Sequence, residues 1–386
     1  MIPYDFFIFA GEPSGDLHGE ALLKSLYALS PNLNILGVGG PRMRATGLTS
    51  LLPMEEFQVM GFTAVLCALP RILRHLFFLS KKIVEANPKV VVCIDYPGFC
   101  LRLERRLRKK GFTGKIVHYI SPTVWAHGKN RAPFLEKYAD LLLTIFPFEK
   151  AYFSPQFHVE YVGHPLIERI ASYSYQPFSF AKEKRVIALF PGSRKKEIDL
   201  NFPLQVKTLK KILGEEKNLI GAISVSKQEF IPLLKATLKK EGVSLENIHF
   251  VPIEKTYELM AHSFLAIAKS GTVTLELALH KVPTIVLYKI APIDLFIAKN
   301  ILRIRLPFYC IVNIILQKEV FKELIGPFAK EESLLIEAKR LLKDTSYYNN
   351  KKELCKELIS YMGTDKASDK AASLLLTSIK NNHSII

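Results

Sequence analysis

The chain has 386 residues, a length that favours two domains over one. Hydrophobic residues make up 49% and charged residues 23%, which excludes a disordered chain, and no uncharged stretch is long enough to span a bilayer. The net charge of +17 indicates an anionic partner: nucleic acid, an anionic membrane surface or a phosphorylated substrate.

Several classes of protein are disfavoured by the absence of their patterns. No RNA-binding, zinc-finger or helix-turn-helix signature is present, so we expect no nucleic-acid partner. The five cysteines are scattered and lack CxxC spacing, which argues against a disulfide framework and a structural zinc site. No basic segment precedes the first apolar run, so we read no signal peptide and expect a cytoplasmic protein.

The first half of the chain alternates strands and helices. We predict strands at Phe6–Ala10, Ile35–Val38, Val90–Ile94, Ile116–Ile120 and Leu141–Ile145. Helices are predicted at about 15–29, 69–86, 99–110 and 147–153. Near-continuous Val, Ile and Leu runs bounded by turns are typical of a parallel sheet that is covered on both faces.

The alternation starts again in the second half, after a polar and aromatic stretch, 171–183, that we interpret as a linker. Strands are predicted at Val186–Phe190, Leu219–Ser224, Ile248–Val251, Leu265–Ala268 and Thr284–Leu287, and from about 328 the chain reads as helical. We therefore expect two doubly wound α/β domains, over 1–170 and 184–349, with ligands bound outside the strand ends. The C-terminal helices, over about 350–386, could pack back on the first domain.

A glycine-containing turn follows the first strand and brings acid and base groups to a helix start. Its candidate residues are Gly11, Glu12, Ser14, Gly15, Asp16 and His18. Glycines here let backbone and ligand approach closely. The alternative is a tight turn in which Ser14 and Asp16 cap the helix.

Asp95 ends the strand KVVVCID. A carboxylate at the carboxyl end of a central parallel strand is partly desolvated, which raises its pKa toward values that suit a general base. The alternative is that Asp95 caps the helix that begins near Phe99.

Two segments of the second half suit an anion. Gly192 and Ser193 follow the first strand there, and Arg194 adds a forked cation. Ser270, Gly271 and Thr272 stand between a buried strand and a helix, whose start offers free N–H groups and a positive dipole end.

Glu276 lies four residues after Thr272, about 6 Å along the helix axis and on the same face. This is roughly the spacing between the phosphates and the ribose hydroxyls of a nucleoside diphosphate, and a carboxylate suits a ribose diol. The alternative is a Thr-capped βαβ unit with an exposed Glu276.

Together these segments resemble one family, the bacterial lipid-A-disaccharide synthases. The motifs occur in family order over nearly the whole chain: AGEPSGD (10–16), GVGGPRM (37–43), VMGF (59–62), IDYPGF (94–99), HYISPTVWA (118–126), FPFEKAYF (146–153), VGHP (162–165), PGSRKKEI (191–198) and SGTVTLELAL (270–279). Several unrelated motifs in register are far more specific than any one of them.

The resemblance implies the glycosyltransferase B architecture, two Rossmann-like domains that face across a cleft. It implies an inverting reaction in which UDP-2,3-diacylglucosamine donates its sugar to 2,3-diacylglucosamine 1-phosphate, giving a β(1→6)-linked disaccharide 1-phosphate and UDP. Asp95 matches the catalytic aspartate, with Glu12 and His18 as the next candidates. Neither a metal nor another cofactor is expected.

The resemblance also implies substrate contacts. Ser270, Gly271, Thr272 and Glu276 fall at the UDP site, with Ser193 and Arg194 nearby. Ser121 and Pro122 of HYISPTVWA, and Asn313 of a family LPNLLAG-like segment, are further candidates. The chain departs from the family at His127, Gly128, Val312 and Gly326, which affects the expected donor contacts.

Acyl chains of both substrates lie in a membrane, and one segment suits its interface. Over 62–83, Leu69, Ile72, Leu73, Leu76, Leu79 and Ile83 recur at helical spacing with basic flanks, and Pro70 suits the first helical residue. We expect a peripheral protein on the cytoplasmic face of the inner membrane, bound to anionic lipids by this segment and by Arg102 to Lys110. The alternative is a helix that only packs on its own sheet.

Two other functions compete with this one. The first is a different glycosyltransferase B enzyme, such as the one that adds N-acetylglucosamine in peptidoglycan synthesis; AGEPSGDLHG argues against it. The second is a basic scaffold without activity, which has no need of Asp95 and Glu276 at strand–helix junctions. A homodimer is compatible with the sequence.

Overall fold

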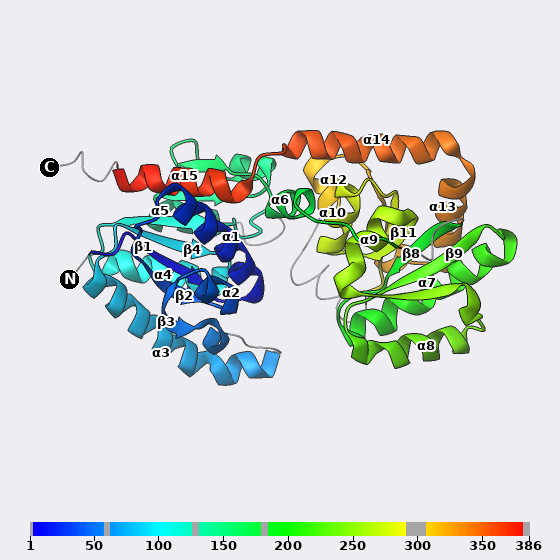
Figure 1. The fold of residues 1–386 in the computed structure, drawn as a ribbon, viewed down its shortest axis with the longest axis horizontal. Helices are drawn as coiled ribbons and strands as arrows, with labels where there is room; N and C mark the ends of the chain where they lie inside the picture. The colour runs from blue at the N-terminus through cyan, green and yellow to red at the C-terminus, as the bar shows by residue number, and fades with distance from the viewer. Residues whose placement is uncertain (1–2, 58–61, 126–130, 179–183, 291–305, 381–386) are drawn as a thin grey trace. The chain divides into compact units, whose positions relative to one another are not determined.

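A computed structural model describes residues 3–57, 62–125, 131–178, 184–290 and 306–380 (Figure 1). The chain divides into two compact units, Met1–Arg169 with Met362–Ile386, and Ile170–Tyr361. Each unit is a parallel sheet with helices on both faces, which confirms the predicted doubly wound α/β class. Within the described residues, no helix has the length and apolar character that a membrane span requires.

The sheet of the first unit has strand order β3-β2-β1-β4-β5-β6-β7, and all its pairs are parallel. The strands are β1 (Phe6–Ala10), β2 (Ile35–Gly39), β3 (Thr49–Pro53), β4 (Val90–Ile94), β5 (Lys115–Tyr119), β6 (Leu141–Thr144) and β7 (Val159–Tyr161). Every residue of β1 and β4 is buried, because helices cover both faces of these central strands.

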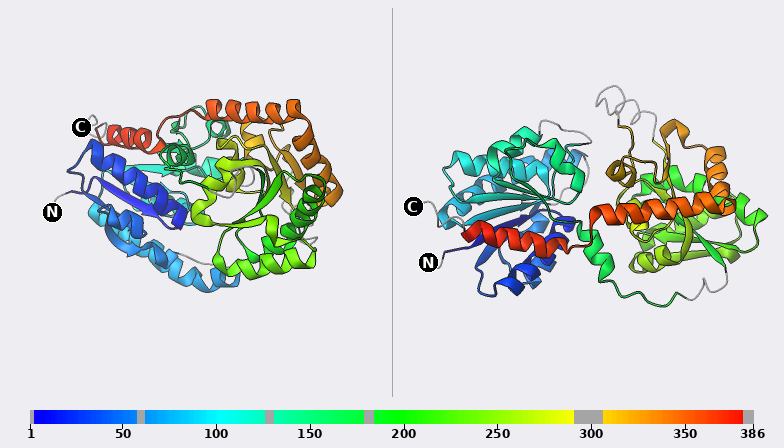
Figure 2. Two further views of the ribbon diagram at one scale, coloured as in Figure 1. Left: turned by 45° about the vertical axis from the view of Figure 1, so that its right-hand side comes forward. Right: turned by 90° about the horizontal axis from the view of Figure 1, so that it is seen from above.

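Helices of the first unit divide between the two faces of this sheet. They are α1 (Pro13–Leu29), α2 (Pro41–Ala45), α3 (Phe62–Ala86), α4 (Pro97–Lys109), α5 (Arg131–Tyr138), α6 (Pro165–Ala171) and α15 (Ala367–Lys380). On one face α15 lies along α1, and Leu22, Leu26 and Leu375 share a core there (Figure 2). On the other face α3, α4 and α5 pack around Phe9, Leu79 and Leu103.

The sheet of the second unit has strand order β10-β9-β8-β11-β12-β13, again all parallel. Its strands are β8 (Arg185–Phe190), β9 (Leu219–Val225), β10 (Ile248–Pro252), β11 (Ser263–Lys269), β12 (Thr284–Tyr288) and β13 (Lys322–Ile325). Its helices are α7 (Lys195–Glu215), α8 (Ile231–Lys240), α9 (Thr256–His262), α10 (Thr272–Leu279), α12 (Ile311–Leu316), α13 (Glu331–Lys343) and α14 (Thr345–Met362). One core joins α7, α8 and α13 to this sheet, and a second joins α9 and α10.

All ten predicted strands are present, and the described residues contain three short strands that were not predicted: β3, β7 and β13. Each of these pairs at or next to a sheet edge and is only partly buried, so it lacks a continuous apolar run. The helix predicted at 147–153 is a 3₁₀ helix, η2 (Pro147–Tyr152).

One further prediction about local structure was wrong, and one segment has contacts that the sequence did not reveal. Pro70 lies inside α3 rather than at its first position, since the helix begins eight residues earlier, at Phe62. Residues 171–178 of the predicted linker pack on the second unit: Tyr173 donates to Glu258 Oε1 (3.0 Å), and the Tyr175 hydroxyl lies 2.8 Å from His280 Nε2. The rest of that stretch, 179–183, lies outside the described residues.

Candidate active site

The junction between β4 and α4 carries the candidate base. Asp95 and Tyr96 both have left-handed backbone, with φ of 49° and 52°, and Ile120 after β5 has φ of 73°. Each such non-glycine residue costs about 1–3 kcal/mol, so this strain is concentrated at the carboxyl edge of the first sheet. Tyr96 occupies the N-cap position of α4, and the alternative role of Asp95 as that cap is therefore wrong.

The electrostatic setting of Asp95 favours proton transfer. Burial raises the pKa of Asp95, against smaller opposing effects of the Tyr96 backbone N–H and His118. Partial burial and the neighbouring Asp95 carboxylate raise the pKa of Glu12, which precedes α1. The two carboxyl groups thus come from adjacent strand–helix junctions and share one electrostatic environment, in which the loss of the second proton is disfavoured.

The glycines of the turn after β1 let this turn pack closely against neighbouring residues. A Cβ on Gly11 would lie 2.7 Å from the Tyr96 ring, and one on Gly15 would lie 3.3 Å from the Ala10 side chain. The Tyr96 hydroxyl donates to the Phe57 carbonyl oxygen (3.0 Å), which fixes the ring over Gly11. Neither Gly11 nor Gly15 is exposed to solvent, and both let α1 begin directly against β1 and β4.

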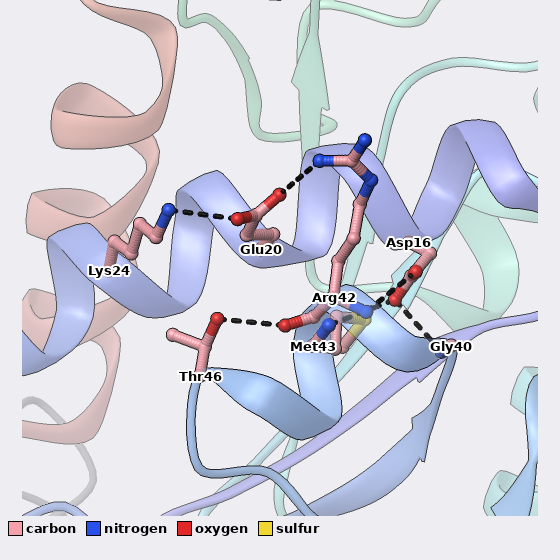
Figure 3. Close-up of polar contacts among 7 residues, drawn as sticks. All are labelled: Asp16, Glu20, Lys24, Gly40, Arg42, Met43 and Thr46. Carbon is pink, nitrogen blue, oxygen red and sulfur yellow. Dashed lines mark hydrogen bonds and ion pairs between the residues drawn. The ribbon is translucent and has the colours of Figure 1, made fainter.

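Asp16, which is predicted to bind substrate, is engaged by the backbone of α2. Its carboxylate accepts hydrogen bonds from three backbone N–H groups at the start of α2: Gly40 (2.8 Å), Met43 (3.0 Å) and Arg42 (3.1 Å) (Figure 3). The alternative that Ser14 and Asp16 cap their own helix is also wrong, because α1 has Glu12 at its N-cap position and no side-chain cap. Ser14 remains exposed in the first turn of α1.

Two histidines lie near the same edge and are held neutral. Burial, with Arg169, lowers the pKa of His18 to about 4 and that of His164 to about 3, where His18 adds to the effect. His164 Nδ1 accepts from the Leu166 N–H (3.1 Å). A base with a pKa of about 4 is a weak proton acceptor at neutral pH, so His18 is poorly suited to act as the base.

The segments after β5 and β6 are packed loops with one unusual carboxyl group. Ser121 and Pro122 are buried, and Ser121 Oγ donates to the Pro122 carbonyl oxygen (3.1 Å). Burial raises the pKa of Glu149 to about 8, although it accepts from the Phe146 N–H (3.1 Å). Glu149 is a third carboxyl group with a raised pKa at this edge, and sequence reasoning did not single it out.

The α10 junction of the second unit matches the predicted anion site in form. Gly271 is the N-cap of α10 in an extended conformation with no side-chain cap, so the alternative of a Thr cap is wrong. Gly271 and Thr272 are exposed, and the first N–H groups of a helix have no partner within it. Glu276 Oε1 accepts from the Tyr257 hydroxyl (3.1 Å), a partner that the sequence did not reveal.

The β8–α7 loop holds an internal carboxylate. Glu197 Oε2 accepts from the Ser193 N–H (3.1 Å), and its Oε1 lies 3.1 Å from Lys269 Nζ and 3.7 Å from Arg194. Burial alone would raise the pKa of Glu197, but Lys269 and the Ser193 N–H lower it. A Cβ on Gly192, whose φ is 125°, would meet Glu197 at 2.8 Å. Glu197 and Lys269 are functional candidates that the sequence analysis missed.

Asn313, which is predicted to bind substrate, is engaged by hydrogen bonds within the second unit. It is fully buried, its Nδ2 donates to the Phe321 carbonyl oxygen (2.8 Å) and Glu323 (2.9 Å), and its Oδ1 accepts from the Phe321 N–H (2.9 Å). Of the family departures, Val312 is buried in α12 and Gly326 has φ of 57°. His127 and Gly128 lie outside the described residues. Among the residues that the structure describes, no three His, Cys, Asp or Glu side chains group as metal ligands.

Comparisons with known proteins agree with the motifs. The family model described as lipid-A-disaccharide synthetase matches residues 6–377. The chain is 39% identical to the lipid-A-disaccharide synthase of Chlamydia pneumoniae over 94% of this chain and 61% of that protein, so it spans about three fifths of that relative. It is 32% identical to the enzyme of the same name from Rhodospirillum centenum, over 98% and 96% of the two chains.

Among solved structures, MurG of Acinetobacter baumannii aligns with 97% of this chain and 100% of its own, with a TM-score of 0.59 and 13% identity. Such a likeness shows the fold alone, and the fold is the glycosyltransferase B architecture that the sequence predicted. The family match, the relatives and the ordered motifs lead to one conclusion: the chain belongs to the lipid-A-disaccharide synthase family.

Proposed function

We propose that this protein is an inverting glycosyltransferase of lipid A biosynthesis. It transfers 2,3-diacylglucosamine from UDP to 2,3-diacylglucosamine 1-phosphate and releases the β(1→6) disaccharide 1-phosphate and UDP. The observation that carries this proposal is Asp95: a carboxyl group on left-handed backbone at the carboxyl edge of a central strand, beside Glu12, with its pKa raised by burial.

In the proposed reaction Asp95 acts as the general base. Its carboxylate accepts the proton of the acceptor hydroxyl as that oxygen attacks the anomeric carbon of the donor sugar. The bond between the anomeric carbon and the diphosphate oxygen breaks, and UDP leaves with the electron pair. Because this is a single displacement, the configuration at the anomeric carbon inverts.

The second unit binds UDP in this proposal. The N–H groups at the start of α10 and the cations Arg194 and Lys269 neutralise the diphosphate. Glu276 accepts hydrogen bonds from the ribose hydroxyls, and Tyr257 orients its carboxylate. Charge on the departing UDP is thereby stabilised.

We further propose that α3 holds the protein on the cytoplasmic face of the inner membrane. The helix has two apolar faces: Leu76, Leu79 and Ile83 are buried in the core, whereas four others are exposed. Their exposed fractions are 49% (Leu69), 40% (Leu73), 51% (Phe77) and 39% (Phe78). Exposed Leu and Phe beside the basic α4 suit an interface with anionic lipid.

The membrane proposal is tested by serine at these four exposed positions. Binding to phosphatidylglycerol vesicles should weaken, while circular dichroism stays unchanged because the buried face is intact. If the variant binds the vesicles as well as wild type, the membrane proposal is wrong and α3 has only a structural role. Leu66, which belongs to the predicted interface, has a side chain outside the described residues and is left unchanged.

The reaction is tested by UDP release. Purified protein in neutral detergent micelles should release UDP only when both diacylated substrates are present, and the product should be a β-linked disaccharide by NMR. Equal turnover with UDP-N-acetylglucosamine as donor would favour the competing glycosyltransferase. No UDP release with any donor would contradict the proposal.

A further inference from the structure

A basic cavity lies among α3, α4 and α5 of the first unit, with a volume of about 820 Å³. Its described lining contains six cationic side chains and no acidic one: Arg102, Arg105, Arg106, Lys109, Lys110 and Arg131. The apolar part of its lining includes Leu76, Leu101 and Phe134. The cavity therefore combines cationic and apolar lining residues.

The cationic side chains of this cavity have no ion-pair partner among the residues that the structure describes. Arg108 of the same helix provides the contrast, since it pairs with Asp140 and donates to the carbonyl oxygens of Phe112 and Gly114 (both 2.9 Å). Like charges three or four residues apart on a helix repel, so the cluster on α4 is unfavourable unless an anion binds.

Hydrogen bonds hold two of the guanidinium groups in place. Arg106 Nε donates to Ser80 Oγ (2.8 Å), and its guanidinium carbon lies 3.8 Å above the Phe77 ring. Arg102 donates to the Gly98 carbonyl oxygen, in the first turn of α4. Such pre-positioned forks suit the bidentate recognition of phosphate oxygens. Phe77 is also one of the exposed apolar residues of α3, so a cation of the cavity lies directly against the proposed lipid-contacting surface.

We infer that this cavity binds the phosphate monoester of the acylated acceptor sugar. The inference rests on the proposed function and adds the acceptor's phosphate site to it. A monoester carries about −1.5 to −2 charges and three acceptor oxygens at neutral pH, which suits several cations better than the single charge of a phosphodiester. The acyl chains would lie along the exposed residues of α3.

The position of the cavity in the chain agrees with this assignment. Pro97 and Gly98, which line it, follow directly after Asp95 and Tyr96. The turn that carries the proposed base thus continues into the wall of the cavity. A sugar whose hydroxyl faces Asp95 can direct its phosphate across the start of α4, so one element orients both ends of the acceptor.

The test compares two acceptors in neutral detergent micelles: 2,3-diacylglucosamine 1-phosphate and the same diacyl sugar without phosphate. In the double variant Arg102→Gln/Arg105→Gln, KM for the phosphorylated acceptor should rise about 10- to 100-fold, as expected for lost charge-assisted hydrogen bonds. KM for UDP-sugar and for the unphosphorylated acceptor should stay within twofold. The control Lys207→Gln/Lys239→Gln removes two exposed charges from the second unit and should change none of these values.

Three outcomes would overturn the assignment. One is an equal loss for both acceptors, because the phosphate is then not what the cavity recognises. Another is an unchanged micellar KM with weaker sedimentation on phosphatidylglycerol vesicles, which would make the cavity a membrane-charge sensor. Calorimetric binding of the phosphorylated acceptor does not depend on turnover. If wild type releases no UDP, the proposed reaction is wrong. The phosphate site is still supported in that case if the double variant loses binding of the phosphorylated acceptor and wild type keeps it. Equal binding of the phosphorylated acceptor by wild type and the double variant would contradict the phosphate site.

Discussion

At the carboxyl edges of the two sheets, the pKa values of acidic side chains are shifted in opposite directions. At the edge of the first sheet, burial raises the pKa of Asp95, Glu12 and Glu149, and Asp95 adds to the shift of Glu12. At the edge of the second sheet, Glu197 is also partly buried, yet Lys269 and the Ser193 N–H lower its pKa. The same place in the topology can therefore favour proton acceptance or anion binding, according to which partners surround the carboxylate.

This difference fits a division of labour within one proposed reaction. A base must be able to take up a proton, so a site that disfavours the charged carboxylate suits the acceptor side. A leaving diphosphate needs fixed cations and N–H groups, and Lys269 and the Ser193 N–H, which lower the pKa of Glu197, lie at the second edge. Four substitutions test this contrast.

The largest effect is expected for Asp95→Asn. The amide keeps the shape and the backbone contact of Asp95 but cannot accept the proton, so turnover should fall by about 10²–10⁴. UDP affinity, measured by calorimetry, should remain at the wild-type value because the nucleotide binds the second unit. Turnover near the wild-type rate would contradict the role of Asp95 as the base and would make Glu12 the next candidate.

Glu276→Ala should have the next largest effect. Removing the carboxylate leaves the ribose hydroxyls and Tyr257 without their acceptor, which corresponds to roughly 1.5–3 kcal/mol for charge-assisted hydrogen bonds. UDP should bind about 10- to 100-fold more weakly by calorimetry on the full chain. The acceptor KM serves as the control, and undiminished UDP affinity would remove Glu276 from the donor site.

Lys269→Met tests whether Lys269 contributes to UDP binding at the carboxyl edge of the second sheet. It removes a cation from the proposed diphosphate site and the ion pair that holds Glu197, so UDP affinity should fall roughly tenfold. A matched control is Lys195→Met on α7, whose exposed lysine pairs with Asp199 at 2.8 Å. Equal losses in both variants would mean that overall charge, rather than the position of Lys269, matters.

Glu149→Gln should leave catalysis unchanged and alter the dependence of stability on pH. Because burial raises the pKa of Glu149 to about 8, the folded state keeps a proton that the unfolded state loses above about 4.3. Wild type should thus lose about 1.4 kcal/mol of stability per pH unit between these values relative to the variant. Urea unfolding at pH 5.5, 6.5 and 7.5 measures this, and parallel curves for the two proteins would contradict a raised pKa.

Much of the fold was predictable because buried parallel strands leave a clear mark on the sequence. The uninterrupted apolar runs of β1 and β4 gave accurate bounds, whereas β13, with the sequence KELI at a sheet edge, gave no such run. Pro70 was read as a helix start because its missing N–H fits that position, but the helix extends through it.

The site was predictable only where a residue's role follows from its place after a strand. Asp95 and Glu276 could be chosen in this way. Asp16 could not be judged, because its partners stand 24 to 27 residues later in the chain. Glu197 and Lys269 were missed for the same reason, since their pairing exists only once β8 and β11 lie side by side.

The dependence of kcat/KM on pH tests the role of Asp95 most directly. If Asp95 is the base, kcat/KM of wild type should rise with pH through one ionisation above the ordinary range of an aspartate, because the reaction needs the deprotonated carboxylate and burial raises its pKa. The residual activity of Asp95→Asn should lack that rise. The same rise at the same pH in Asp95→Asn would contradict the account.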